Sequence, residues 1–228
     1  MKSERIPVKS FSADNGFIGK MQKLVREEVL PYQYNILNDA IPGIEKSHAI
    51  ENIRLAAEKL RGKDVKPDEF YGMVFQDSDV AKWIEAAAYA LAAGEDPELE
   101  KAVDETIQLY GASQHEDGYV DSYFTVKCPD KMWTNICDAH ELYCAGHMME
   151  AAVAYYEVTG KRELLDIMSK SADCIYEQFM KKNTRAYPGH PEVELALMRL
   201  WRATGNEKYK ELAKHFVDVR GQAPNYFV

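Results

Sequence analysis

The sequence predicts an all-α fold built from αα-hairpins. Apolar residues recur with the 3.6-residue period of one helix face through most of the chain, as at Ile50, Ile53 and Ala57. Alternation typical of a β-strand is confined to about residues 119–126. Three segments follow the order helix, glycine turn, helix, which is the pattern of an αα-hairpin. The turn glycines are Gly94, Gly160 and Gly205.

Eight helices are expected, and local signals mark several of their ends. They cover about residues 17–29, 50–60, 80–91, 97–110, 140–159, 163–179, 191–204 and 207–219. Pro31 should stop the first helix, because proline has no N–H for the helical ladder. The expected N-caps are Asp77, Ser78 or Asp79 for the third helix, and Asp96, followed by Pro97, for the fourth.

The spacing of the turn glycines favours a closed α/α barrel over a regular solenoid. Solenoids of the tetratricopeptide type repeat about every 34 residues, whereas these glycines lie 66 and 45 residues apart. The long segments between the hairpins are rich in His, Asp, Asn, Trp and Tyr, as loops that carry binding sites often are. The helix at 140–159 is apolar on nearly all sides, so we expect it in a buried inner ring.

Composition and charge exclude several classes of protein. The 228 residues are 46% hydrophobic and 29% charged, which is typical of a globular chain. With 28 Lys and Arg against 37 Asp and Glu, the net charge is -9, so we expect no nucleic-acid partner and no membrane partner. No apolar run approaches the length of a membrane span. The N-terminus has no signal-peptide pattern, which predicts a cytoplasmic location unless a signal was removed earlier.

The cysteines predict neither a disulfide framework nor a metal site. Cys128, Cys137, Cys144 and Cys174 include no C-x-x-C pair, and they are sparse for a chain of this length. We therefore expect reduced, mostly buried thiols.

Five strings of the sequence, spread from about residue 17 to residue 222, resemble glycoside hydrolase family 127, the β-L-arabinofuranosidase-like enzymes. The strings are FYGMVFQDSDVAKWIEAAAYAL, QHEDGYVDSYF, MWTNICDAHELYCAGHMMEAAVAYYEVTGKRELL, YPGHPEVELALMRLWRATGNEKY and VDVRGQ. The resemblance implies an (α/α)6 barrel, a six-hairpin toroid of twelve helices. Since about eight helices are expected, residues 1–228 would form a truncated, N-terminal portion of that glycoside hydrolase domain.

The resemblance also implies an unusual retaining hydrolysis of L-arabinofuranosides from plant-type glycans. In the family, a cysteine thiolate attacks the anomeric carbon, and a zinc ion bound by three cysteines and a glutamate keeps that thiolate deprotonated. A second glutamate is the general acid/base. These family motifs lie C-terminal to everything in this sequence, so we assign no catalytic residue and no metal ligand here. Zinc is implied for the full-length family enzyme. No cofactor is expected for this chain, and the isolated chain is expected to be inactive.

Part of the sugar pocket is expected in this chain. His140 and His190 match the histidines of the family's substrate pocket, and an imidazole can donate or accept a hydrogen bond to a sugar hydroxyl. Asp77, Asp79 and Tyr119 are further substrate-binding candidates. Each candidate also has a structural alternative. His140 could be a hydrogen-bonded structural histidine, and His190 could be a turn residue. The two aspartates could cap a helix, and the tyrosine could pack its loop against the core.

Three other hypotheses have weaker support. His140, Cys144 and His147 share one helix face with ligand-like spacing, but H-E-x-x-H requires histidine where Cys144 stands, so we do not expect a metal site there. A shortened, non-catalytic helical-repeat module could bind a carbohydrate or a protein, and its exposed half-barrel faces could form a homo-oligomer. Other α/α barrels carry epimerases, lyases and uronyl hydrolases, but the acids and bases that these need are not found here.

Overall fold

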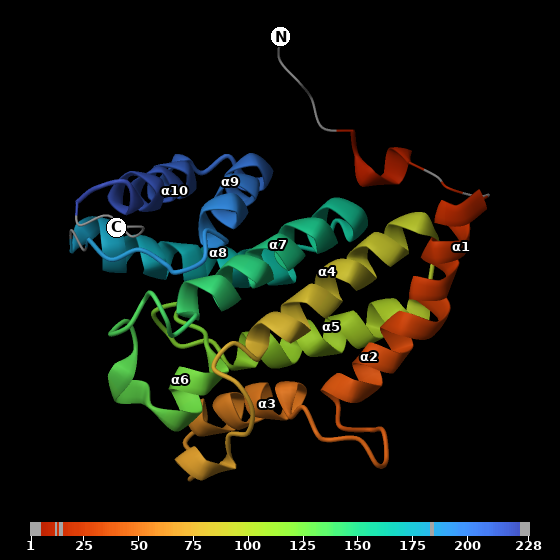
Figure 1. Ribbon diagram of the computed structural model, residues 1–228, viewed down its shortest axis with the longest axis horizontal. Helices are drawn as coiled ribbons and strands as arrows, with labels where there is room; N and C mark the ends of the chain where they lie inside the picture. Colours follow the sequence, from red (N-terminus) through yellow and green to blue (C-terminus); the bar gives the residue numbers. More distant parts are fainter. Residues whose placement is uncertain (1–5, 12, 14–15, 183–184, 224–228) are drawn as a thin grey trace.

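The computed structural model describes residues 6–11, 13, 16–182 and 185–223, and this part of the chain is all-helical (Figure 1). Its α-helices are α1 (Gly16–Leu24), α2 (Leu30–Leu37), α3 (Ala49–Leu60), α4 (Asp77–Ala93), α5 (Pro97–Ala112), α6 (Ser122–Lys127), α7 (Glu141–Thr159), α8 (Glu163–Tyr176), α9 (Val193–Thr204) and α10 (Glu207–Arg220). Short 3-10 or π turns are η1 (Val8–Ser10), η2 (Val25–Val29), η3 (Pro67–Glu69), η4 (Pro129–Lys131) and η5 (Glu177–Lys181). The predicted fold class is confirmed.

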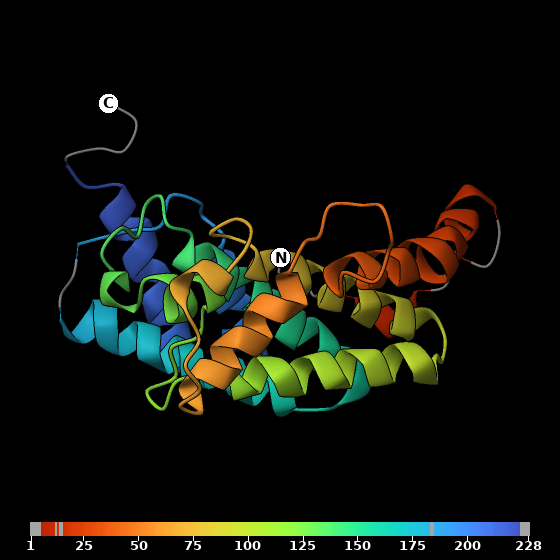
Figure 2. The same ribbon diagram turned by 90° about the horizontal axis from the view of Figure 1, so that it is seen from below.

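Three αα-hairpins form an arc of two layers. The pairs α4–α5, α7–α8 and α9–α10 are the predicted hairpins, and their turns contain the predicted glycines. Helix α7 lies between α4 and α9 and packs against both (Figure 1). Helices α5, α8 and α10 pack against their hairpin partners and, in that order, against one another; Figure 2 shows α5 and α8 along one face. The N-termini of α4, α7 and α9 therefore meet at one end of the arc.

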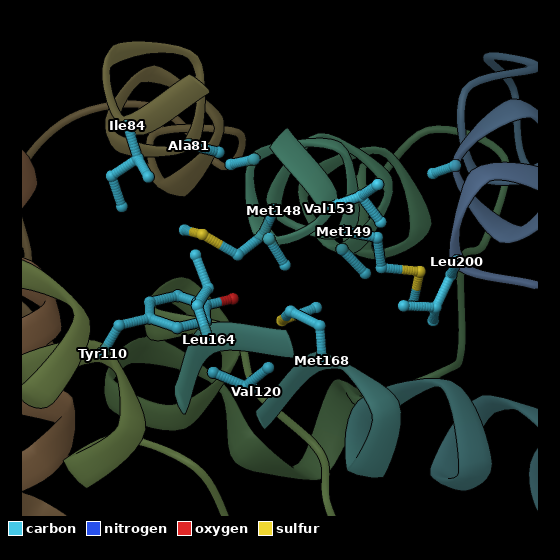
Figure 3. Close-up of a cluster of buried hydrophobic side chains, with 14 of the residues drawn as sticks. Ala81, Ile84, Tyr110, Val120, Met148, Met149, Val153, Leu164, Met168 and Leu200 are labelled. Carbon is cyan, nitrogen blue, oxygen red and sulfur yellow. The ribbon is translucent and has the colours of Figure 1, made fainter. Parts of the chain in front are cut away.

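The core is centred on α7, as its uniformly apolar sequence predicts. Met148, Met149 and Val153 are buried between layers, where Figure 3 shows them facing side chains of α4, α5, α8 and α9. The surrounding residues include Ile84, Tyr110, Leu164, Met168 and Leu200. Each fully buried side chain of this kind stabilises the fold by about 1.5–3 kcal/mol relative to an exposed one. This packing fixes the end of α7 at which the polar residues lie.

Pro31 does not stop the first helix, so this prediction was wrong. The chain continues from α1 through the π turn η2 into α2, and Pro31 lies in the first turn of α2. In the π turn the N–H of Leu30 reaches back to the carbonyl of Val25. This wider turn ends just before the proline and accommodates a residue that has no N–H.

Two further local predictions were also wrong. Residues 122–127 form α6 rather than a strand, because the carboxylate of Asp121 caps the helix by accepting from the N–H of Phe124 at 3.0 Å. Helix α4 begins after Gln76 without a side-chain cap, so none of the three expected residues caps it. By contrast, Asp96 does cap α5 and accepts from the N–H of Leu99 at 3.1 Å.

The four cysteines are free thiols, as predicted, but only Cys144 is buried, and the other three are half-buried. No helix in the described part of the chain has both the length and the apolar character that a membrane crossing needs.

Candidate functional site

The N-termini of α4, α7 and α9 and the loops that precede them lie at one end of the arc (Figure 1). Polar and aromatic side chains from these segments contact one another there. The two histidines that the sequence singles out, His140 and His190, come from different loops, and their ring centroids lie 5.0 Å apart. Phe75, just before α4, lies 5.3 Å from the ring of His140. The fold thus brings together residues that directly precede α4, α7 and α9, the three helices that we call the inner helices.

A tyrosine connects three imidazoles at this end of the fold. The ring centroid of Tyr143 lies 4.5 Å from that of His147, 4.9 Å from that of His190 and 5.6 Å from that of His140. We call these four residues the histidine cluster. His190 is exposed and the other three are half-buried, so the cluster can be reached from solvent.

His140 is held in place by its backbone. It is the residue before α7 and has a φ of 64°, a left-handed conformation that is uncommon for a residue other than glycine. Its Nδ1 lies 2.6 Å from the carbonyl oxygen of Asp138. A carbonyl only accepts hydrogen bonds, so in the neutral ring Nδ1 carries the proton and Nε2 presents its lone pair. His140 can therefore accept a hydrogen bond from a ligand hydroxyl.

Two glycines allow the loop before α9 to approach α7. A Cβ on Gly146 would lie 2.9 Å from Cγ of Glu192 and 3.0 Å from the backbone nitrogen of Val193. A Cβ on Gly189 would lie 2.2 Å from the carbonyl oxygen of Cys137. Both positions have room only for hydrogen, and this close packing brings His190 to the cluster.

His147 faces Glu192 across the junction of α7 and α9. Nδ1 of His147 lies 3.4 Å from Oε1 of Glu192. Burial, reinforced by the positive charge of Lys82, lowers the pKa of His147 to about 4, so the ring is neutral at pH 7. Burial and the nearby carboxylates of Glu150 and Glu85 raise the pKa of Glu192 to about 7. The contact is therefore not an ion pair at neutral pH, and Glu192 can hold or release a proton there.

Lys82 of α4 adds a cation beside the cluster. Its Nζ donates hydrogen bonds to the hydroxyl of Tyr143 and to Oγ of Ser78, each at 3.1 Å. Nζ also lies 5.1 Å from the centroid of the Tyr143 ring. Tyr143, Lys82 and Glu192 were not among the sequence-based candidates. Tyr143 lies in the HELYC string itself, which could have drawn attention to it.

Asp77 lies beneath the site rather than in it. It is 4% exposed, and its two oxygens accept from the N–H and the hydroxyl of Ser122, the former at 2.8 Å. Burial raises its pKa. These contacts anchor the start of α6 to α4. Asp79 is half-buried in the first turn of α4, and burial raises its pKa while Lys82 opposes the shift. A substrate contact by either residue stays a prediction.

Tyr119 is also buried below the cluster. Its hydroxyl donates to Oε1 of Glu141 at 2.7 Å, and its ring packs edge-on against Trp133 at 4.9 Å. The N–H of Trp133 donates to the same carboxylate. Burial raises the pKa of Glu141 to about 7, against these two hydrogen bonds, which lower it. These contacts of Tyr119 explain how the segment 113–133, which includes α6, is held in place. A role for Tyr119 in substrate binding stays a prediction.

The two neighbouring glutamates of the GHPEVE string face different partners. Glu192 faces His147, whereas Glu194 accepts a hydrogen bond from Arg220 at 2.8 Å. Arg220 also lies over the ring of Tyr187.

The residues described here do not fit a zinc site of the kind that the family resemblance implies. Burial raises the pKa of the Cys144 thiol well above its usual range and that of Cys174 to about 12, whereas a zinc ligand must be a thiolate. Cys144 is buried, whereas His140 and His147 face Tyr143. Among residues 6–11, 13, 16–182 and 185–223, no group of three or more His, Cys, Asp or Glu is placed to hold a metal.

Comparisons with known proteins agree on one family. Residues 12–226 match the model of the β-L-arabinofuranosidase GH127 catalytic domain. The chain is 41% identical over 221 residues to a non-reducing end β-L-arabinofuranosidase of Bifidobacterium longum, and the match covers 88% of this chain and 32% of that protein.

Two solved structures are similar as well. The GH127 β-L-arabinofuranosidase of Geobacillus stearothermophilus T6 superposes with a TM-score of 0.84 at 52% identity, covering 93% of this chain and 33% of that one. The GH127 β-arabinofuranosidase BT3674 superposes with a TM-score of 0.82 at 32% identity, covering 95% of this chain and 34% of that one. The chain thus spans about a third of the length of these relatives.

Proposed function

Because the chain belongs to the GH127 β-L-arabinofuranosidase catalytic-domain family, we propose that it supplies part of the sugar pocket of a retaining L-arabinofuranosidase. It would be an N-terminal portion of the α/α-barrel domain. The single observation that carries the proposal is the juxtaposition of His140 and His190, 5.0 Å apart at the ends of the inner helices. We expect these two imidazoles to bind the sugar part of the substrate.

The cluster offers hydrogen-bonding groups of both kinds to a furanose. Nε2 of His140 accepts from a hydroxyl, because its Nδ1 is committed to the carbonyl of Asp138. His190 makes ring contacts but no hydrogen bond within the described part of the chain, so both of its nitrogens are available to a ligand. Lys82 can donate from its exposed ammonium. A sugar hydroxyl can both donate and accept a hydrogen bond, so it can pair with either kind of group.

The bond-breaking groups are proposed to lie outside this chain. Glu192 has a pKa of about 7, but its contact is with His147, and the nearby carboxylates of Glu150 and Glu85 are paired with Arg199. Glu192 therefore has no acid/base partner of the kind that a glycosidase uses among these neighbours. We therefore assign no nucleophile and no general acid here, and zinc of the complete family enzyme would be held by other residues. The chain by itself should not hydrolyse an aryl L-arabinofuranoside; normal turnover by the purified chain would refute this assignment.

Sugar binding is tested by titrating methyl β-L-arabinofuranoside into protein labelled with 15N-histidine. The expected result is a saturable shift of the His140 and His190 side-chain signals. His140→Ala and His190→Ala should each weaken binding at least about fivefold, the effect of one lost hydrogen bond. His215→Ala, on the distant helix α10, is the matched control and should bind as wild type. Equal shifts with methyl β-D-xylopyranoside, or none with the arabinoside, would contradict the proposal.

The second candidate is a non-catalytic binding module, favoured by large apolar side chains that are exposed to solvent. Large apolar side chains are exposed on α1 and α9, including Phe17 at 75% and Leu195 at 56%. Such faces could pair two copies of the chain. Light scattering across a dilution series distinguishes a homo-oligomer from a monomer. A monomer at all concentrations would contradict this pairing of two copies.

A further inference from the structure

Tyr143 occupies the centre of the histidine cluster. Its ring meets His147 nearly edge-on, at 85°, and lies against His190 at 50° and His140 at 88°. These three imidazoles come from α7 and from the two loops that precede α7 and α9. Aromatic pairs at such separations each contribute about 0.5–1.5 kcal/mol beyond the area that they bury. One phenol ring therefore contacts three imidazoles at once.

The orientation of the Tyr143 ring is itself fixed from a second helix. Lys82 of α4 donates to the Tyr143 hydroxyl at 3.1 Å, and the same ammonium donates to Oγ of Ser78 at 3.1 Å. Ser78 is fully buried, so its position is set by the core. Lys82 therefore connects the rigid start of α4 to the tip of the Tyr143 side chain.

The two sugar-facing histidines depend on this ring to different degrees. The backbone conformation of His140 and its hydrogen bond to Asp138 already limit that side chain. The side chain of His190 makes no hydrogen bond among the described residues, and its ring contacts are with His140 and Tyr143. A change at Tyr143 should consequently disturb His190 more than His140.

We infer that Tyr143, held by Lys82, is a positioning residue that orients His190, and through it the pair of histidines, for binding of a furanose. The inference rests on the proposed sugar-binding role of these histidines. Tyr143 itself need not touch the sugar, and its effect on binding passes through the imidazole rings.

The test reads the imidazoles directly before any sugar is added. Long-range 1H–15N spectra of 15N-histidine protein report the tautomer and the environment of each ring. In wild type, His140 should show a protonated Nδ1 and an unprotonated Nε2, and His190 should give one sharp set of signals. In Tyr143→Leu, His190 should shift and broaden because it samples several rotamers, while His140 keeps its tautomer. Tyr156→Leu, a half-buried tyrosine near the far end of α7, is the matched control and should leave both rings unchanged.

Two milder variants keep the test decisive if Tyr143→Leu does not fold. Tyr143→Phe and Lys82→Met both break the link at the hydroxyl, and Lys82 is exposed, so neither change opens the core. Both should broaden the His190 signals. Tyr143→Phe, which leaves the Lys82 ammonium in place, should also weaken methyl β-L-arabinofuranoside binding about threefold to tenfold, the effect of one hydrogen bond. Unchanged His190 spectra in a folded variant would overturn the positioning role.

The two proposals fail in distinguishable ways. If wild type does not bind the arabinoside but His190 broadens in the variants, the sugar-binding proposal fails and the structural link between Tyr143 and His190 stands. If wild type binds it and the variants bind equally well with sharp His190 signals, the positioning role fails alone.

Discussion

Gly146 of α7 lies against Val193 so closely that a Cβ on Gly146 would stand 3.0 Å from the backbone nitrogen of Val193. The same Cβ would meet Cγ of Glu192 at 2.9 Å. The contact joins the second turn of α7 to the first turn of α9, and His190 lies directly before that turn. The absence of a side chain at one position therefore controls where the loop with His190 sits.

Gly146→Ala should destabilise the protein by about 1–3 kcal/mol, because an added methyl group overpacks the contact with α9. This net loss is expected even though alanine favours a helix over glycine by about 1 kcal/mol. Urea unfolding measures the change. Gly111→Ala in α5 is the matched control: its Cβ would meet only the flexible end of Ile167, at 2.8 Å, so its cost should be smaller or absent. Equal effects of the two changes would contradict the special role of Gly146.

Glu141 should make the protein less stable as the pH rises. The pKa of Glu141 is about 7 in the folded protein against 4.5 for the free side chain, so the folded state binds its proton more tightly. Its contribution to stability is fully present below about pH 4.5 and is lost between about pH 4.5 and pH 7. The loss is at most about 3.5 kcal/mol, at about 1.4 kcal/mol for each pKa unit.

Glu141→Gln removes this titration, so the variant's free energy of unfolding should fall less steeply over the same pH range. Glu192, whose pKa is also raised to about 7, should keep part of the slope in the variant. Urea unfolding at a series of pH values tests this. Glu116→Gln, at an exposed loop position, should retain the wild-type profile. A Glu141→Gln profile parallel to wild type would refute the shifted pKa.

How much the sequence could predict depends on the range of the interactions involved. The hairpins α4–α5, α7–α8 and α9–α10 were predictable, because helix periodicity and a glycine turn are local signals. The helix end predicted from Pro31 and the helix cap predicted at Asp77 were wrong for different reasons. A π turn absorbs the proline, and Asp77 binds Ser122, which lies 45 residues further along the chain.

The candidate site was predictable only in part. His140 and His190 were found through the family resemblance, since no periodicity relates residues fifty positions apart. Tyr143 and Lys82 were missed because their importance comes from a contact between α7 and α4, which the sequence does not show. Neither the close approach at Gly146 nor the burial of Tyr119 could be derived before the helices were placed relative to one another.

Asp77→Asn should cost about 2–3 kcal/mol, because two donors of Ser122 point at a carboxylate that the amide only half replaces. Asp79→Asn, two residues later and half-buried, should cost about 1 kcal/mol or less, the worth of one charge at a helix N-terminus. Thermal or urea unfolding compares them. If the larger loss of stability came from Asp79→Asn, the anchoring role of Asp77 would be wrong.

Arg199 joins the three inner helices through a single guanidinium. Its Nη1 contacts Glu85 of α4 at 3.0 Å and also contacts Glu150 of α7, while Nη2 donates to the hydroxyl of Tyr89 at 3.2 Å. The Tyr89 hydroxyl in turn donates to Glu85 at 3.0 Å. The Arg199 side chain is only 17% exposed, so water does not screen these interactions fully.

Arg199→Met should therefore destabilise the protein by about 2–4 kcal/mol at pH 7, because the buried carboxylate of Glu150 and the half-buried carboxylate of Glu85 are left without a cation. Arg202→Met, less than one turn further along α9 at an exposed position, is the matched control and should change stability by about 0.5 kcal/mol or less. Urea unfolding at pH 7 separates the two variants. Equal losses for both arginines would show that the guanidinium does not hold α4, α7 and α9 together.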